Sequence, residues 1–131
     1  MTAAWSIDEL DRIGAADELH IAARRTDGTL RRPLPIWVTR VSDELYICSW
    51  RGPDGSWYRA AQTSGEAHIN AGGVERDVVL EPIDSDAIDD AIDAAYRDKY
   101  SRYPSYVEPM ISDQARATTL RLVPRTAEDI A

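Results

Sequence analysis

The 131-residue sequence contains very little cysteine and histidine, and these two shortages exclude several kinds of site. Its one cysteine, Cys48, can form neither an internal disulfide nor a thiolate metal cluster, and its place in an apolar run indicates a buried, inert thiol. The two histidines, His20 and His68, lie far apart and have no neighbours at the spacing of metal ligands. We therefore expect surface or hydrogen-bonded histidines and no metal site.

Long apolar runs are also missing, as are the motifs of several large enzyme classes. No run approaches the roughly 18 residues of a membrane span, and the first residues lack the basic and apolar regions of a signal peptide. The sequence has no Walker loop, no Rossmann fingerprint and no Gly-x-Ser-x-Gly elbow. These absences predict a cytoplasmic protein without a membrane partner, and the length predicts a single domain over residues 1–131.

The chain is acidic, with a net charge of −8 and a sequence pI near 4.7. This charge argues against a nucleic-acid partner, because a phosphate backbone binds basic surfaces. The acid is concentrated in residues 1–19 and 84–98, whereas seven of the fourteen arginines lie in residues 20–60. Arginine binds phosphate and carboxylate groups through two parallel hydrogen bonds. Although most of these arginines are expected to be solvated, the pattern favours a small anionic ligand.

Apolar periodicity and turn residues predict an α+β fold. A capping box at Ser6–Glu9 predicts a helix within residues 1–17, and a second, longer helix is predicted after Asp84–Ser85. Two prolines, Pro33 and Pro35, suit an edge strand or the entry to a strand and not a central strand. The six predicted strands cover residues 19–24, 33–41, 45–50, 68–71, 76–83 and 118–123, a short helix covers 56–62, and 126–131 form a polar tail. Because turn signals join most strands directly, we predict a mostly antiparallel six-stranded β-barrel with peripheral helices.

Two groups of residues could carry chemistry. The stretch from Trp50 to Tyr58 combines a glycine-containing turn with the start of a helix, where free N–H groups attract anions, and arginines and tryptophans flank it. An equally good interpretation places those tryptophans in the core. The second group is a tyrosine series that ends at Tyr103 and Tyr106, on either side of Pro104. Since proline ends a helix, we expect these two phenols on a loop, where they could donate a hydrogen bond or a proton to a substrate.

These segments together resemble the split β-barrel flavin- and deazaflavin-binding proteins, especially the deazaflavin-dependent nitroreductases. The stretches that carry the resemblance are 24–31, 49–60, 99–106 and 120–125. Shorter stretches at 36–38, 57–59, 99–100 and 119–122 resemble the bacterial domain-of-unknown-function family 2255. The resemblance implies an FMN-binding type of split barrel, usually a homodimer with its cofactor at or near the subunit interface.

The resemblance also implies a role for each matching residue. The cofactor phosphate and tail would lie at Arg24, Arg25 and Thr26, the ring or phosphate at Ser49, Trp50 and Arg51, and Trp57 would open the supporting helix. Tyr106 or Tyr103 would lie on the substrate side as the catalytic hydroxyl. The implied function is an oxidoreductase that uses FMN or a deazaflavin coenzyme to reduce a small organic molecule. The alternative is a non-catalytic barrel that binds a small ligand.

Overall fold

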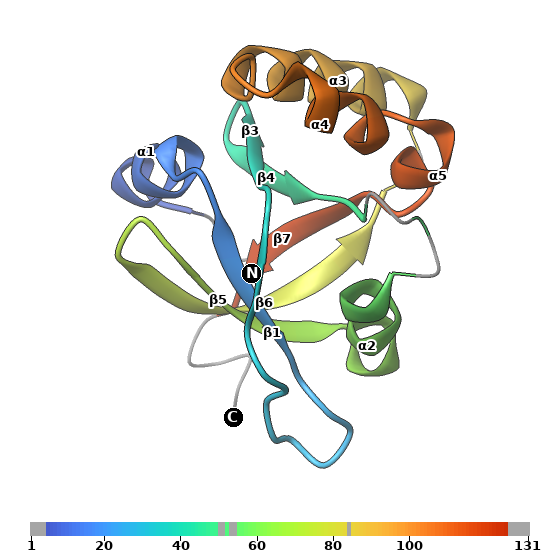
Figure 1. The fold of residues 1–131 in the computed structure, drawn as a ribbon. Coiled ribbons are helices and arrows are strands. Elements are labelled where there is room, and N and C mark those ends of the chain that lie inside the picture. Colours follow the sequence, from blue (N-terminus) through green and yellow to red (C-terminus); the bar gives the residue numbers. More distant parts are fainter. Residues whose placement is uncertain (1–4, 50–51, 53–54, 84, 126–131) are drawn as a thin grey trace.

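A computed structural model describes residues 5–49, 52, 55–83 and 85–125 of the chain (Figure 1). Trp50, Arg51 and the predicted tail at 126–131 lie outside the described residues. The strands are β1 (Leu19–Ala23), β2 (Leu34–Ile36), β3 (Thr39–Val41), β4 (Glu44–Ile47), β5 (Glu66–Ala71), β6 (Val74–Pro82) and β7 (Leu120–Pro124). The helices are α1 (Ile7–Ala15), α2 (Ser56–Ser64), α3 (Asp86–Lys99), α4 (Pro104–Met110) and α5 (Asp113–Arg116).

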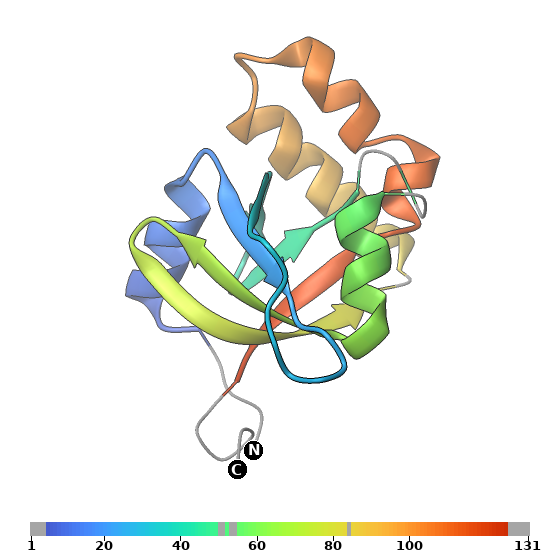
Figure 2. The ribbon, with the colours of Figure 1, turned by 60° about the horizontal axis from the view of Figure 1, so that its bottom comes forward.

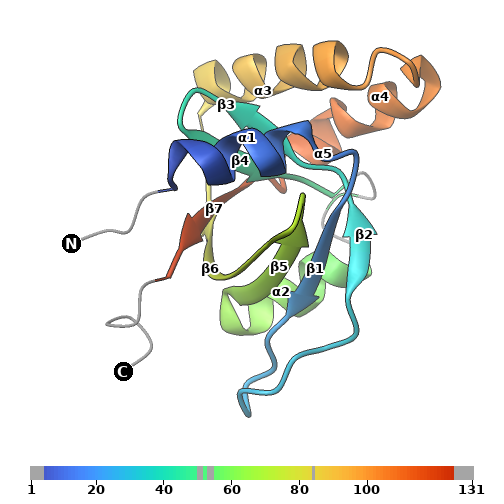
Figure 3. The same ribbon diagram turned by 90° about the vertical axis from the view of Figure 1, so that its left-hand side faces the viewer.

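The strands form one antiparallel sheet that curls into a split barrel. The strand order is β2-β1-β5-β6-β7-β4-β3, so β2 and β3 are the two edges of the sheet. Yet only Trp37 and Val38 separate these strands in the sequence. Three residue steps of extended chain span about 10 Å, so the two edges of the sheet must lie close together. The curl is visible in Figure 3, and it confirms the predicted α+β, mostly antiparallel barrel.

The strand count differs from the prediction at one place. Residues 33–41 were expected to form one strand, but the structure has β2 and β3 there. The segment is extended throughout, and it leaves one edge of the sheet to join the other, so a local pattern could not reveal the break. Both strands are edges. For β2 this agrees with the prediction from the prolines, because Pro35 has no N–H to offer to a second neighbour.

Strand β4 separates two apolar cores. Side chains alternate between the faces of a strand, so Leu45 and Ile47 point into the barrel while Tyr46 and Cys48 point outward. Helices α1 and α2 also contribute side chains to the inner core. Helix α2 packs against β1 and β5 (Figure 2). The outer core is closed by α3, α4 and α5, which lie together on one side of the molecule (Figure 1). The barrel alone therefore does not bury all the apolar surface.

The predicted helix starts are confirmed by their hydrogen bonds. At α1 the Ser6 hydroxyl accepts from the Glu9 N–H at 3.1 Å, and the Glu9 carboxylate accepts from the Ser6 N–H at 3.0 Å. At α3 the Ser85 hydroxyl accepts from the Ile88 N–H. Acidic side chains in the first turn of α3 and basic side chains in its last turn interact favourably with the helix dipole and stabilise the helix.

The segment after α3 is where the prediction was wrong. Pro104 was expected to end a helix before a loop, but it opens α4 at the first helical turn, and Tyr103 is the residue that caps this helix. Proline suits that position because the N–H it lacks has no partner in the first turn. Tyr106 therefore lies in α4 and not in a loop.

None of the helices in the described ranges combines the length and the apolar character that crossing a membrane requires.

Candidate functional site

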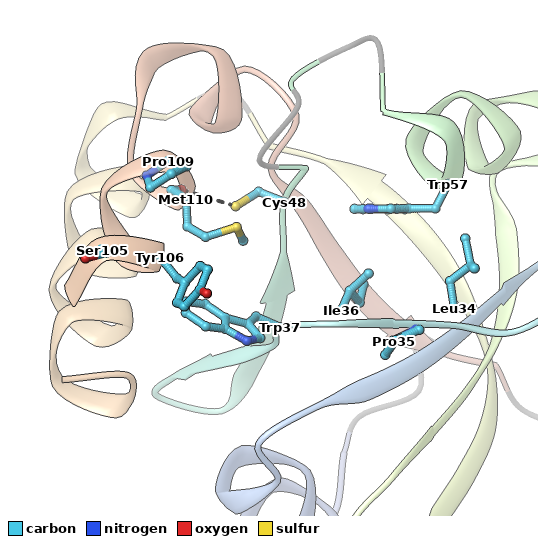
Figure 4. Close-up of a pocket in the computed structure, with 10 residues that line it drawn as sticks. All are labelled: Leu34, Pro35, Ile36, Trp37, Cys48, Trp57, Ser105, Tyr106, Pro109 and Met110. Carbon is cyan, nitrogen blue, oxygen red and sulfur yellow. Dashed lines mark hydrogen bonds between the residues drawn. The ribbon is translucent and has the colours of Figure 1, made fainter. Parts of the chain in front are cut away.

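A cavity of about 660 Å³ opens between α4 on one side and β2 with α2 on the other (Figure 4). Its size lies within the range of about 300–1,000 Å³ that is usual for small-molecule sites. The cavity is lined by Leu34, Pro35, Ile36, Trp37, Cys48, Trp57, Ser105, Tyr106, Pro109 and Met110. None of these side chains carries a formal charge, so the cavity suits the apolar, ring-bearing part of a ligand.

Two tryptophans give this cavity flat walls. Trp57 projects from α2 and meets Tyr58 edge-on, with ring centroids 6.0 Å apart and an interplanar angle of 86°. Trp37 stacks on Tyr100, with centroids 3.8 Å apart and planes within 2°. The Tyr100 hydroxyl donates to the Asp17 carbonyl at 2.8 Å, which fixes the stack against the loop after α1. These walls are therefore held in place by the core and the backbone and do not depend on a ligand for their position.

Cys48 contributes a neutral thiol to the cavity wall. Its sulfur lies 3.5 Å from the Met110 carbonyl oxygen, to which it donates, and 3.7 Å from the Tyr96 hydroxyl. Burial raises the pKa of the Cys48 thiol to about 12, because the charged thiolate would lose its hydration there. The thiolate is the reactive form of cysteine, so Cys48 is the buried, inert group that the sequence predicted.

The structure brings two of the predicted site residues to this cavity. Trp57 and Tyr106 line it from opposite sides, and Tyr106 is also widely accessible, with 67% of its surface exposed. Tyr103 does not line this cavity but a smaller one beside it. The rings of Tyr103 and Tyr106 meet edge-on, with centroids 6.5 Å apart.

The predicted phosphate residues lie elsewhere. Arg24, Arg25 and Thr26 belong to the hairpin between β1 and β2, which projects away from α3 and α4 (Figure 3). The Arg24 guanidinium donates to the Gly28 carbonyl at 2.7 Å and pairs with Asp77 at 3.1 Å. Arg25 donates to the Thr29 hydroxyl and the Leu30 carbonyl. Both arginines thus brace their own hairpin, although the hairpin leads directly into the cavity-lining strand β2.

Ser49 is buried at the end of the segment that follows β4. Its backbone N–H donates to the Thr118 hydroxyl at 2.7 Å, and its hydroxyl faces Gly55, the cap of α2. Ser49 thus lies below the start of α2, and it is not among the lining residues of either cavity. Trp50 and Arg51 follow it and lie outside the described residues.

The histidines behave as predicted. His20 is exposed on β1, and His68 lies 3.0 Å from Asp77 and 3.4 Å from Glu75. Among the described residues, no group of histidine, cysteine and acidic side chains has the arrangement of a metal site.

Sequence reasoning did not single out Trp37 and Met110 as site residues. A tryptophan just after the Pro-Ile of an edge strand was the one available signal, since edge strands leave their neighbours accessible. Met110 carried no local signal, because its position in the cavity depends on α4, which was not predicted.

The fold and the family of the chain are clear from comparison with known proteins. The sequence model of the family described as "Uncharacterized protein conserved in bacteria (DUF2255)" matches residues 9–122. No curated protein matches the chain. Solved structures match the fold across most of the chain, at identities too low to show more than the fold.

Three of these structures illustrate the likeness. A conserved hypothetical protein from Mycobacterium tuberculosis is 12% identical and has a TM-score of 0.65, with coverage of 95% of this chain and 83% of that one. An F420-H2 dependent reductase is 15% identical, with a TM-score of 0.59 and coverage of 82% and 93%. A FAD and heme binding protein from Mycobacterium smegmatis is 21% identical, with a TM-score of 0.53 and coverage of 95% and 77%.

Proposed function

Because this chain belongs to the bacterial family DUF2255 and shares the split barrel of flavin- and F420-binding proteins, we propose that it binds a flavin-type cofactor and reduces a small organic molecule. The observation that carries the proposal is the apolar cavity of about 660 Å³ between Trp57 and Tyr106. A planar ring system fits such a space, since aromatic walls bind flat rings by stacking and by burying apolar area. FMN and a deazaflavin coenzyme are the two candidates.

Different residues of the chain would bind the ring of the cofactor and its phosphate-bearing tail. Trp57 and Trp37 would hold the ring, while Leu34, Ile36 and Met110 keep water from it. Since the cavity lining has no charged side chain, the phosphate-bearing tail would extend outside it. We assign that tail to Arg24, Arg25 and Thr26 on the hairpin before β2, and to the segment of Ser49, Trp50 and Arg51.

The reduction needs an electron source and a proton source. A bound, reduced flavin or deazaflavin supplies two electrons and one proton to an acceptor. The Tyr106 hydroxyl would then orient the acceptor by a hydrogen bond and deliver the second proton, which solvent replaces because Tyr106 is exposed. Tyr103 is the second candidate for this role, from the neighbouring cavity. We further propose a cytoplasmic homodimer as the working form.

Cofactor binding is tested by titrating the purified protein with FMN and with F420 and following the quenching of tryptophan fluorescence. We expect one of them to bind at micromolar concentration, and Trp57→Ala to weaken that binding roughly tenfold, because stacking on an aromatic ring contributes about 1–3 kcal/mol. Arg121→Ala is the control, since Arg121 pairs with Glu81 on the sheet and lines neither cavity. Absence of binding of both cofactors at tens of micromolar would contradict the proposal.

A second function is favoured by the same apolar lining. A barrel that only binds and carries a small apolar ligand needs the cavity but no electron donor. The alternative would be supported by an apolar fluorescent dye that binds the wild-type protein, binds Trp57→Ala more weakly, and is displaced by neither FMN nor F420. Turnover of an acceptor by the loaded, reduced protein would exclude it.

A further inference from the structure

A second cavity of about 300 Å³ lies beside the first and shares Trp37 and Tyr106 with it. Its other lining residues are Asp17, Glu18, Tyr100 and Tyr103. Four aromatic side chains and two carboxylates thus border one small space. Within the described part of the chain, none of its lining side chains is basic. The faces of aromatic rings carry partial negative charge, so rings and carboxylates together attract a cation.

One wall of this cavity is rigid and the other is accessible. The Trp37–Tyr100 stack is fixed, because Tyr100 is buried and its hydroxyl donates to the Asp17 carbonyl. The same hydrogen bond holds the loop that carries Asp17 and Glu18. Tyr103 and Tyr106 are 41% and 67% exposed, and their rings meet at an interplanar angle of 63°. A ligand could therefore contact these rings without moving the core.

The chain's own cations already contact this group of rings. The Arg102 guanidinium lies 5.6 Å from the Tyr103 ring centroid and 3.5 Å from the Asp17 carboxylate. Both of these charged side chains are about 70% exposed, so this pair is weak and easily displaced. Lys99 lies 5.0 Å from the centroid of Tyr100. Glu18 is exposed and makes no ion pair with another described residue.

We propose that this cavity binds a small organic cation of the quaternary or alkylated ammonium class. The exposed rings of Tyr103 and Tyr106 and the edges of the Trp37–Tyr100 stack would contact its alkyl groups, while Glu18 and Asp17 would balance its charge. Arg102 then acts as an internal competitor, because it uses Asp17 and Tyr103, two of the same partners. The site goes beyond the proposed reduction, and because it shares Trp37 and Tyr106 with the larger cavity, its test uses the cofactor-free protein.

The test compares choline with its neutral carbon isostere, in which a tert-butyl group replaces the trimethylammonium group. Calorimetry on the cofactor-free protein measures both affinities. We expect choline to bind at least fivefold more tightly, since only the charged ligand gains from rings and carboxylates. Equal affinities, or absence of choline binding at millimolar concentration, would overturn the proposal without affecting the flavin titration.

Two variants of opposite effect sharpen the test. Glu18→Gln should weaken choline binding at least threefold, whereas Arg102→Gln should strengthen it at least twofold, because the competing guanidinium is gone. Arg59→Gln is the matched control: it makes the same change in net charge at an exposed site on α2. If Arg102→Gln and Arg59→Gln change the affinity equally, only overall charge matters and the proposed site is wrong. All three side chains are on the surface or in loops, so the variants should fold.

Discussion

Among single residues, Lys99 is a group whose surroundings change its protonation at mildly basic pH. It ends α3, and its amino group donates to the Val38 carbonyl at 2.6 Å. Burial lowers the pKa of Lys99 from 10.5 to about 8, because the ammonium loses hydration that one carbonyl only partly replaces. Asp17 acts in the opposite direction, since its negative charge favours the ammonium.

This pKa can be measured on the native protein, because Lys99 is the only lysine in the chain. We expect the rate of its acetylation to reach half of its maximum near pH 8, where an exposed lysine would still be almost fully protonated. Peptide mass spectrometry separates Lys99 from the N-terminal amino group. A rate that is still rising tenfold per pH unit at pH 9 would contradict the lowered pKa.

The same lowered pKa predicts how stability depends on pH. Between about pH 8 and 10.5 the unfolded chain keeps a proton on Lys99 that the folded chain has lost. The contribution of Lys99 to the free energy of unfolding therefore rises with pH in this window. Cys48, whose pKa is raised by burial from 9.0 to about 12, acts in the opposite direction above about pH 8.5, because the unfolded chain loses the thiol proton first. Tyr96 and Tyr100, whose pKa values are also raised by burial, oppose the rise above pH 10. Urea unfolding of the wild-type protein and of Lys99→Met at pH 8 and pH 9.5 isolates the Lys99 contribution, since both proteins keep Cys48, and the stability of the wild-type protein relative to the variant should be higher at pH 9.5.

Residue types were predicted better than residue roles. The inert Cys48 and the partnered His68 are confirmed, because burial and strand position follow from local sequence. Trp57 and Tyr106 were chosen for their chemistry, and both line the larger cavity. Trp37 was not chosen, since its importance arises from contacts with Tyr100, which is 63 positions away in the sequence and is brought near only by the packing of α3.

At the scale of elements, the approach of α2 to the end of β4 depends on one glycine. Gly55 caps α2 in an ordinary extended conformation, with φ of −61°. A Cβ atom at this position would lie 2.2 Å from the Ser49 hydroxyl oxygen and 3.4 Å from the Ser49 Cβ. The requirement for glycine is thus a matter of space and not of backbone conformation, and the hydroxyl group is what fills that space.

Gly55→Ala should therefore lower the free energy of unfolding by about 1–3 kcal/mol, as overpacking usually does. The double variant Ser49→Ala/Gly55→Ala should recover most of this loss, because the nearest remaining atom is 3.4 Å away. Urea unfolding monitored by circular dichroism measures both.

The control for this substitution is Gly14→Ala. Gly14 lies in α1, and a Cβ atom there would make an ordinary contact with the Arg40 side chain at 3.4 Å. Alanine there should be neutral or stabilise the helix by about 0.5–1 kcal/mol. If Gly55→Ala were as harmless as Gly14→Ala, the close approach of Ser49 and Gly55 would be wrong.

Elements with local signals were predicted, and those without them were not. The capping box of α1 and the serine cap of α3 need only neighbouring residues, and both are confirmed. The break at Trp37 and Val38 has no local signal, because both halves of the segment are extended and only the closure of the barrel separates them. Pro104 marks a boundary between two helices, and the sequence pattern showed the end of the first but not the start of the second.

At the scale of the whole molecule, apolar side chains remain exposed around the larger cavity. Leu34, on the edge strand β2, is 38% exposed and lines the cavity, so the side of its mouth opposite Tyr106 is bordered by apolar surface. An edge strand with free backbone groups beside exposed apolar side chains is a surface that a partner usually covers. This surface fits the proposed homodimer.

We therefore expect light scattering to give a mass of about twice the 14.6 kDa of one chain at micromolar concentration. Leu34→Glu should shift the protein toward the monomer, because it would bury a charge in the interface and remove apolar area from it. Ile7→Glu is the control, since Ile7 is even more exposed, at 62%, but lies on α1 and lines neither cavity. A mass of one chain for the wild-type protein at all concentrations would contradict the homodimer. A dimer that Ile7→Glu dissociates and Leu34→Glu does not would place the interface away from the cavity, and flavin binding would then depend on one chain alone.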